Sequence, residues 1–535
     1  MDGAEPIKVA GIEVPAEERT PLVDRLLRVV EEQQAEIKAL RDEIDRLKGL
    51  PRRPIIRPST LNEPHPDPKH KKRRRGKRPG SAKRQKTAEL VIHKTIPVPL
   101  DGLPEGTRQN GYEDFVVQDL NIEAHNICYR RLRYQLPDGT SRTAPLPAHV
   151  QGHFGSGLRG YVLYLHHQCG VTQPLIHEAL LDLGIDISTG QIDRLLTEGH
   201  EQFHEEKDAL LPAAREVSSY FQADDTSARH LGKNAYTTVI TNPLFASFTT
   251  TASKSRVNFL KLLRFPHEEY VWNEDAFLYA QSQGLSLELR ARLASATGKG
   301  MRIFSSDKAW ERQLVAWKIR SDEPRRIVTE AALFGTLMHY ELYVGQPLLS
   351  DDAGQFKILG LLHALCWLHA ERSIRKLVPL SPREQEAIDG VRDAVWKYYQ
   401  RLRAYRETPT PQRKAALERD FERLFRQRTG FADLNEALRR IHEKRDDLLL
   451  VLERPEIPLH NNLSESDIRE WAKRRKISAG TRSELGRRCR DTFVSLKKTC
   501  RKLGVSFWRY LQDRIRGAHE ILALPELMRQ AAQET

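Results

Sequence analysis

SYFQADD, at residues 219–225, joins a short apolar run to two carboxylates that follow it directly. Two further runs rich in β-branched and aromatic residues come soon after it, at 236–241 and 245–251. Short runs of this composition, separated by polar or turn-forming residues, are typical of neighbouring β-strands. The sequence therefore predicts that a sheet begins with the strand that ends at Ala223.

A second strand-like run ends in the same way. QPLLS, at residues 346–350, is followed by Asp351 and Asp352, as the first run is followed by Asp224 and Asp225. Ligand sites in open α/β sheets lie beyond the carboxyl ends of strands, and carboxylates there are suitable ligands for Mg²⁺. Because adjacent residues of a strand point to opposite faces, the sequence leaves open which member of each acidic pair faces the site.

A third carboxylate is expected to complete such a site, and Glu465 in HNNLSE at residues 460–465 is the candidate. Two metal ions about 3.5–4 Å apart could then hold the attacking and leaving oxygens of a phosphoryl transfer. Asn462 and Glu465 also have the spacing of a capping box, which would make Glu465 an ordinary helix cap. Both interpretations are compatible with a helix that begins here.

Positive charge is concentrated in two blocks of this 535-residue chain. Lys and Arg number 86 and Asp and Glu 72, for a net charge of +14. Residues 51–90 and 466–516 each carry a net charge of +11, so the rest of the chain is acidic. Two local basic blocks predict a polyanionic partner, most simply nucleic acid. The longest nearly apolar run, 358–368, is far short of the ~20 residues of a membrane span. We therefore expect no membrane partner and a cytoplasmic, nucleoid-associated protein.

The N-terminal segment predicts an oligomer followed by a linker. Residues 22–47 carry a heptad pattern of Val or Ile at one position and mostly Leu three residues later, which favours a parallel two-stranded coiled coil. Residues 51–90 are rich in proline and basic residues, a composition that cannot bury a core. The candidate DNA-binding residues of the two basic blocks are Lys71, Lys72, Arg73, Arg74, Arg75, Lys77, Arg78, Arg469, Lys473, Arg474, Arg475 and Lys476.

Seven segments follow from composition and periodicity. Residues 91–150 read as a small β-rich domain, with alternating residues at 129–136 and a turn at 137–139. Helices are expected at 158–168, 173–183 and 188–196, a helix-turn-helix-like arrangement. An apolar helix is expected at 357–377, and long charged helices at 382–450 and 463–520. The predicted segments are a coiled coil (1–50), a linker (51–90), the β-rich domain (91–150), a helix-turn-helix-like helical region (151–215), a mixed region that begins with the sheet (216–380), a charged helical region (381–455) and a basic C-terminal part (456–535).

Four motifs in a fixed order make the chain recognisable. They are ADDT at 223–226, LSD at 349–351, CWLHAER at 366–372 and NNLSE at 461–465 with basic residues behind it. Together they resemble the transposases of the insertion sequence 66 family, which belong to the DDE class. The resemblance covers nearly the whole chain, from the heptad segment to the basic C-terminal helix.

The resemblance implies an α/β catalytic core of RNase H-like type, which begins in residues 216–380 and has a large all-helical insertion at 381–455. The helical region at 151–215 would then be a DNA-binding region. Asp224, Asp351 and Glu465 would be the catalytic triad and would bind two Mg²⁺ ions, which Mn²⁺ could replace. The enzyme would cut the ends of its element and join the 3′-hydroxyls to target DNA, with companion proteins of the same element as further partners. The motif residues Cys366, Trp367, His369, Arg372, Asn461 and Asn462 would have supporting roles.

Other functions and sites stay open at this point. A non-catalytic DNA-binding or regulatory protein derived from a transposase would keep the basic blocks and the coiled coil. A metal-dependent nuclease without strand transfer would keep the acids. Cys366 and His369 resemble half of a metal site, although core packing explains Cys366 on an apolar segment. His125 and Cys128 would be zinc ligands only if further ligands converged on them.

Overall fold

The computed structural model describes residues 7–9, 12–14, 23, 90–104, 106–108, 110–147, 150, 152–297 and 300–534. The chain forms two units, 1–119 and 120–535. In the first, β1 (Ile7–Val9) pairs with β2 (Ile12–Val14) as an antiparallel hairpin. The predicted coiled coil and the basic linker with Lys71 to Arg78 lie outside the described residues, except for Val23 and Leu90.

The second unit begins with one small hairpin. β3 (Arg133–Gln135) pairs with β4 (Ser141–Thr143) in antiparallel register. The amide of Leu136 donates to the Thr140 carbonyl at 2.7 Å, which closes the turn. This confirms the predicted hairpin, with shorter strands than the pattern indicated. Among the described residues from 90 to 150, these two strands are the only ones.

A mixed five-stranded sheet is the centre of the second unit. Its order is β11–β10–β5–β6–β7. β6 runs antiparallel to both of its neighbours, β5 and β7, whereas β10 and β11 run parallel to β5. The strands are β5 (Phe221–His230), β6 (Lys233–Thr241), β7 (Ala246–Thr251), β10 (Leu348–Ser350) and β11 (His363–Leu365). The α/β character predicted from the strand-like runs is confirmed.

Helices precede the sheet where they were expected. Gly170, at φ +77°, ends the π-helical turn at 165–169. The Ser188 hydroxyl accepts a hydrogen bond from the amide of Gln191 and so caps the helix that begins at Thr189. These features agree with the three helices predicted from the sequence. The elements are α2 (Ser156–Tyr164), the π-helical turn η3 (Leu165–Cys169), α3 (Gln173–Asp182), α4 (Thr189–Thr197) and α5 (Glu201–Val217).

The free edge of the sheet at β7 is closed by side chains of α17 (Glu484–Lys502). Three side chains four residues apart on this helix accept hydrogen bonds from alternate backbone amides of the strand. The bonds join Ala246 to Thr499, Phe248 to Ser495 and Thr250 to Asp491, at 3.2, 2.9 and 2.8 Å. Because unpaired edge amides invite pairing with other strands, this helix both covers and satisfies the edge.

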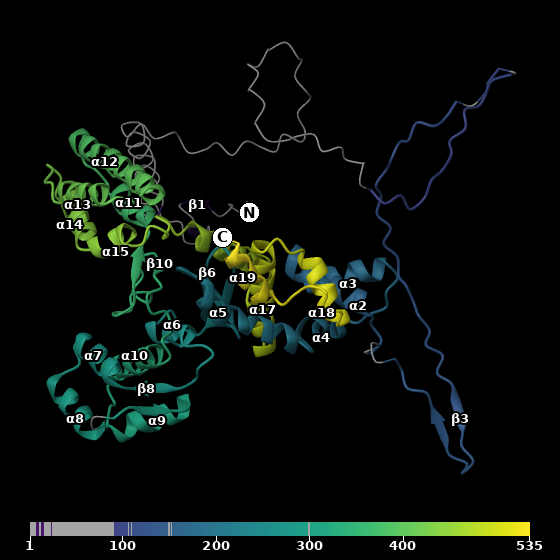
Figure 1. The fold of residues 1–535 in the computed structure, drawn as a ribbon, viewed down its shortest axis with the longest axis horizontal. Helices are drawn as coiled ribbons and strands as arrows, with labels where there is room; N and C mark the ends of the chain where they lie inside the picture. The colour runs from purple at the N-terminus through teal and green to yellow at the C-terminus, as the bar shows by residue number, and fades with distance from the viewer. Residues whose placement is uncertain are drawn as a thin grey trace. The chain divides into compact units, whose positions relative to one another are not determined.

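A compact helical subdomain is inserted between β7 and β10. In Figure 1 its helices α7 to α10 gather around the strand β8. Tyr270, Trp310 and Trp317 supply an aromatic core, with the Tyr270 and Trp310 rings stacked 5.0 Å apart. The elements are α6 (Arg256–Leu263), β8 (Tyr270–Trp272), α7 (Glu274–Ser282), α8 (Leu287–Thr297), β9 (Arg302–Phe304), α9 (Asp307–Ala316) and α10 (Asp322–His339).

A second helical group follows β11, and Figure 1 shows it as one bundle. It has its own core of buried apolar side chains. The prediction of a continuous helix over 357–377 is wrong in its first half, because the apolar residues from His363 pair with β10 as a buried strand. The elements are α11 (Trp367–Arg375), α12 (Pro382–Glu407), α13 (Pro411–Phe425), α14 (Ala432–His442), α15 (Arg445–Leu449) and the 3₁₀ turn η4 (Leu450–Leu452).

The chain ends in four helices that pack back onto the sheet and α5. They are α16 (Asn462–Ser478), α17, α18 (Phe507–Arg516) and α19 (Leu524–Gln533). The helical character predicted for 463–520 is confirmed. None of the helices in the described part of the chain is long and apolar enough to cross a membrane.

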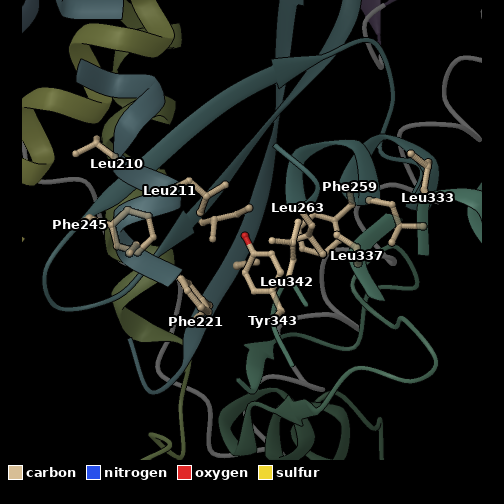
Figure 2. Packing of buried hydrophobic residues seen from close by; sticks show 14 of the residues in the cluster. Leu210, Leu211, Phe221, Phe245, Phe259, Leu263, Leu333, Leu337, Leu342 and Tyr343 are labelled. Carbon is tan, nitrogen blue, oxygen red and sulfur yellow. The ribbon is translucent and has the colours of Figure 1, made fainter. Parts of the chain in front are cut away.

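The core between α5 and the sheet fixes the start of β5. Figure 2 shows Phe221 between Phe245 and Tyr343, and the ring centroids are 6.1 and 5.1 Å from that of Phe221. Leu210 and Leu211 of α5 belong to the same cluster and are buried. Burial of each such side chain stabilises the fold by about 1.5–3 kcal/mol. The strand that carries the first candidate acid is therefore held rigidly.

Buried histidines predict a stability that falls in mild acid. Burial lowers the pKa of His166 to about 3 and that of His167 well below its usual value, with positive charges such as Arg474 adding to the effect. The unfolded chain takes up these protons as the pH falls below about 6.5, whereas the folded chain does not. We expect the free energy of unfolding to fall by about 2 kcal/mol per buried histidine between pH 7.5 and 5.

Urea unfolding at several pH values tests this expectation. His167→Phe keeps the ring that stacks 4.3 Å from Phe493 but cannot titrate, so its pH dependence should be about 2 kcal/mol smaller. The exposed His153, changed to Gln, is the control and should behave as wild type. An unchanged pH dependence in His167→Phe would show that the histidine is already protonated in the folded chain.

Candidate active site

Asp224 and Asp351 meet because of the parallel register between β5 and β10. Phe221 pairs with Leu348, and Gln222 with Leu349. Each acid lies two residues beyond the last pair, on neighbouring strands. The register therefore places the two acids at the same edge of this parallel pair.

The prediction that the first strand ends before Asp224 is wrong. β5 continues to His230 because β6 pairs with it in antiparallel register along its whole length, with Asp224 opposite Val239. Only the pairing with β10 stops before the acid. Asp224 thus projects from the middle of a long, well-fixed strand.

Glu465 reaches the same place through the first turn of α16. Asn461, which is 1% exposed, precedes the helix, and its Nδ2 donates to the Ala223 carbonyl at 3.0 Å. The amide of Ser464 donates to the Gln222 side chain at 3.4 Å. These bonds join the helix start to β5 immediately before Asp224. The capping-box interpretation is wrong, since the helix begins at Asn462 and Glu465 is its fourth residue.

The electrostatics of Asp224 show that the three acids share one environment. Burial raises the pKa of Asp224 to about 7, against the lowering effect of a hydrogen bond from the Asp225 amide. The neighbouring carboxylates of Asp351, Asp225 and Glu465 raise this pKa further. A buried carboxyl that resists ionisation beside other carboxylates is poised to receive a cation.

One oxygen of Glu465 is buried without a hydrogen bond. In the described structure Oε1 has no hydrogen-bond partner, and the His369 Nε2 atom lies 3.9 Å from it. The other oxygen, Oε2, lies 3.4 Å from the Arg469 guanidinium. Buried acceptors are normally satisfied, so an unpaired carboxylate oxygen beside two other acids is consistent with a ligand position.

The second member of each acidic pair is neutralised by lysine. Lys254 Nζ lies 2.7 Å from Asp225, to which Gln355 also donates. Asp352 is paired with Lys357 at 2.6 Å and with Lys444, and these lysines lower its pKa despite the opposing effect of burial. No ion pair joins Asp224 or Asp351 to a cation among the residues that the structure describes. Lys254, Gln355 and Lys444 are distant in sequence from the acids that they contact, so sequence pattern could not find them.

A cavity of about 570 Å³ opens beside Asp351. Its walls come from the β11–α11 junction, including Cys366 and His369, and from α14, including Glu436 and Arg440. Asp351 is therefore accessible from the side of the helical bundle.

Comparison with known proteins identifies a family whose model matches part of this chain. Residues 302–488 match the model of the family described as Transposase IS66 family. The chain is also similar to the uncharacterized protein y4jO of Sinorhizobium fredii, with 42% identity over 321 residues that cover 57% of this chain and 94% of that protein.

The chain belongs to the IS66 family of transposases.

The matched region contains Asp351 and Glu465, whereas Asp224 lies before it. The family gives the chain a transposase-related function, with DNA as the substrate that such a function requires.

The motif helix of this IS66 chain, α11, has mainly a packing and connecting role. Trp367 is buried, and its Nε1 donates to the Leu448 carbonyl at 3.0 Å. Cys366 is also buried, in agreement with the expectation of core packing. The Arg372 Nη1 atom lies 3.1 Å from His369 Nε2. His369 therefore lies between Arg372 and Glu465. Asn462, unlike Asn461, is exposed.

The basic residues of α16 separate into two groups. Arg469, Lys473 and Lys476 are exposed. Arg474 departs from the prediction of DNA contact, because it is 6% exposed and donates to the His166 carbonyl. Burial lowers its pKa to about 10. Arg475 donates to Ser227 of β5 and so also supports the docking of the helix.

Internal ion pairs reduce the exposed charge of this basic block further. Lys497 pairs with Glu470 at 2.6 Å, and Lys502 with Asp467 at 2.8 Å. Net charge in sequence therefore overstates the positive surface, because the acidic partners that neutralise it are visible only in the fold.

The carboxylates fit a divalent metal ion in charge and chemistry. Asp224, Asp351 and Glu465 offer hard oxygen ligands, and one of these oxygens is buried and unpaired. In the part of the chain that the structure describes, no three His, Cys, Asp or Glu side chains are close enough to form a metal site by themselves. His125 and Cys128 are exposed. Water and DNA phosphate, which commonly complete Mg²⁺ coordination, would supply the remaining ligands.

Proposed function

We propose that this chain is a DDE transposase that cuts the ends of its insertion sequence and joins the 3′-hydroxyls to target DNA by two-metal phosphoryl transfer. The observation that carries the proposal is that Asp224 and Asp351 occupy equivalent positions on neighbouring strands, and that the first turn of α16, which carries Glu465, is hydrogen-bonded to β5 directly before Asp224. Among the described residues, none of the three forms an ion pair with a lysine, whereas Asp225 and Asp352 do. We propose an RNase H-like core, supported by an antiparallel β7–β6–β5 sheet extended by parallel β10 and β11.

Each acid would act as a ligand that is fixed in place and ionised. When bound, the metal ions would activate the attacking oxygen and stabilise the leaving oxygen. Asp224 and Asp351 are held by the strands, and Glu465 by the bonds of the first turn of α16 to β5. Because the acids need not exchange protons with the DNA, their role depends on placement rather than on acid–base strength.

The exposed face of α16 supports a path for the DNA backbone. Arg469, Lys473 and Lys476 follow Glu465 at intervals of four, four and three residues, so all four lie on one face of the helix. A phosphate backbone that follows this face would arrive at the site. We propose these three residues, with Lys71 to Arg78 of the linker, as DNA contacts.

Removing two charges from this face should weaken DNA binding. The double variant Lys473→Ala and Lys476→Ala is expected to lose about 10-fold in affinity and to reduce the salt slope of binding by about 2. Fluorescence anisotropy at several salt concentrations measures both quantities. Arg474→Ala is the matched control, and it should lower stability because Arg474 is buried. Equal effects of both changes on binding would contradict the division of this helix into two groups.

The coiled coil proposed for residues 22–47 predicts that this segment helps to pair two DNA ends, a role separate from DNA binding. Deleting residues 1–50 should impair the joint complex of two DNA ends much more than the binding of one end. A gel-shift experiment with two labelled end fragments of different length separates the two complexes. If both complexes are lost equally, the segment does not multimerise the protein.

A cleavage assay tests the proposed function. DNA from the flanks of the gene, with Mg²⁺ and any companion proteins of the element, should be nicked at a specific position by wild type and not by Asp351→Asn or Glu465→Gln. Asp352→Asn is the matched control and should cleave. Specific binding without metal-dependent nicking would favour a non-catalytic DNA-binding protein, and nicking without joining would favour a nuclease.

A further inference from the structure

The residues that precede the candidate acids are connected by hydrogen bonds. Ala223 comes directly before Asp224, and Ser350 directly before Asp351. The Ala223 carbonyl accepts a hydrogen bond from Asn461, and the Ser350 carbonyl accepts one from Cys366. The third acid, Glu465, is one helical turn after Asn461.

Asn461 joins β5 to the start of α16. Its Nδ2 donates to the Ala223 carbonyl at 3.0 Å, and its Oδ1 accepts from the Ser464 hydroxyl at 2.5 Å. Its own carbonyl accepts from the amide of Glu465 at 3.1 Å. The side chain is 1% exposed, so these bonds do not compete with water.

Cys366 joins β10 to the same asparagine. Its amide donates to the Ser350 carbonyl at 3.1 Å, and its Sγ accepts from the amide of Asn461 at 3.3 Å. The residue is 1% exposed. One path of hydrogen bonds therefore runs from Ser350 through Cys366 and Asn461 to Ala223.

We propose that Asn461 and Cys366 are positioning residues that set the distances between Asp224, Asp351 and Glu465. This inference rests on the proposed function, because it assigns these residues to the geometry of the same catalytic site. Both side chains make their hydrogen bonds within the protein, to the backbone and to Ser464. Their effect is to fix three elements that are far apart in sequence.

The hydrogen bonds at position 461 require a side-chain amide. Asparagine supplies a donor for Ala223 and an acceptor for Ser464 in one short side chain. Aspartate has the same shape but only acceptors when ionised, so it would oppose the Ala223 carbonyl. A misplacement of about 1 Å is enough to lower catalysis about 100-fold.

Asn461→Asp tests the proposed positioning role of Asn461. Asn462→Asp, at the next and exposed position, is the matched control. We expect Asn461→Asp to lower the rate of end cleavage about 100-fold and to raise the half-saturating Mg²⁺ concentration about 10-fold. DNA affinity should stay within about 2-fold of wild type, because no DNA contact is removed. Asn462→Asp should match wild type in all three measurements.

A milder pair of variants decides the question if Asn461→Asp fails to fold. Cys366→Ala removes the acceptor for the Asn461 amide, and Cys366→Ser restores one. Cys366→Ala should raise the half-saturating Mg²⁺ concentration with a thermal midpoint close to wild type, and Cys366→Ser should return it toward the wild-type value.

Mn²⁺ binding to the DNA-bound chain, measured by electron paramagnetic resonance, separates this inference from the proposed function. Wild type that cleaves and binds Mn²⁺, with weaker Mn²⁺ binding in Asn461→Asp and Cys366→Ala, supports the inference. Wild-type activity with unchanged metal dependence in both variants overturns the inference and leaves the proposed function intact. A wild-type chain that neither cleaves nor binds Mn²⁺ overturns both.

Discussion

Asp224→Asn should produce a chain that no longer cleaves DNA and is more stable than wild type. Loss of a proposed metal ligand should reduce cleavage by at least about 10³-fold. The gain in stability follows from the pKa of Asp224, which burial and neighbouring carboxylates raise to about 7. At pH 8 the folded chain must hold this group ionised in an unfavourable place, a cost that the amide does not have.

The sign and pH window of the gain are specific. A carboxyl whose pKa is raised on folding destabilises the fold above its ordinary pKa, and the cost is complete above the raised pKa. The shift corresponds to at most about 4 kcal/mol, and partial exposure reduces the expected gain at pH 8 to about 1–3 kcal/mol. Near pH 5.5 the gain should be about half as large.

Urea unfolding in EDTA at the two pH values measures this gain, and a DNA-binding assay checks that the variant is intact. Asp225→Asn is the matched control, because it removes the carboxylate that pairs with Lys254 at 2.7 Å. That variant should be no more stable than wild type. A loss of stability in Asp224→Asn at pH 8, or normal cleavage by it, would contradict the assignment of this acid.

The second large effect is expected from Trp367→Ala. Trp367 is 2% exposed, and its ring lies 5.4 Å from Tyr398 and 6.2 Å from Phe421 and Phe425. The change removes this packing and the hydrogen bond to Leu448, so we expect a loss of about 3–5 kcal/mol. The helical bundle from α11 to α15 should lose most, because this side chain belongs to its core.

Hydrogen exchange resolves where the stability is lost. Amides of α12 to α14 should exchange about 10²–10³-fold faster in Trp367→Ala, since each 1.4 kcal/mol is a factor of ten. Trp396→Ala is the control, because Trp396 is 36% exposed. It should change the free energy of unfolding by less than about 1 kcal/mol. Similar losses in both variants would show that Trp367 does not anchor the bundle.

Local patterns were sufficient for most helices and for the three strands that start the sheet. The helices from residue 156 to residue 197 carry turn glycines and a serine cap, signals that act within a few residues. Asp224 and Asp351 became candidates because a pair of acids follows each of two strand-like runs, and this pattern is also local. Glu465 became the third candidate from its place at an expected helix start, and the family motifs point to the same residue.

Features that depend on long-range packing were missed. β5 continues past Asp224 because β6 pairs with it, and no residue before the acid signals this pairing. The apolar run at 363–365 became a strand because β10 was available as its partner. Arg474 carries the same charge as Lys473 and Lys476, and only the position of η3 decides that it is buried.

Replacing each proposed metal ligand by cysteine tests the central claim most directly. Mg²⁺ binds thiolates poorly, whereas softer metal ions accept them. We predict that Asp224→Cys, Asp351→Cys and Glu465→Cys fail to cleave the element end in Mg²⁺ and recover measurable cleavage in Mn²⁺. Asp225→Cys and Asp352→Cys should show no such dependence on the metal. Recovery in these two controls and not in the three candidates, or full Mg²⁺-dependent cleavage by any candidate variant, would contradict the proposed metal-binding triad.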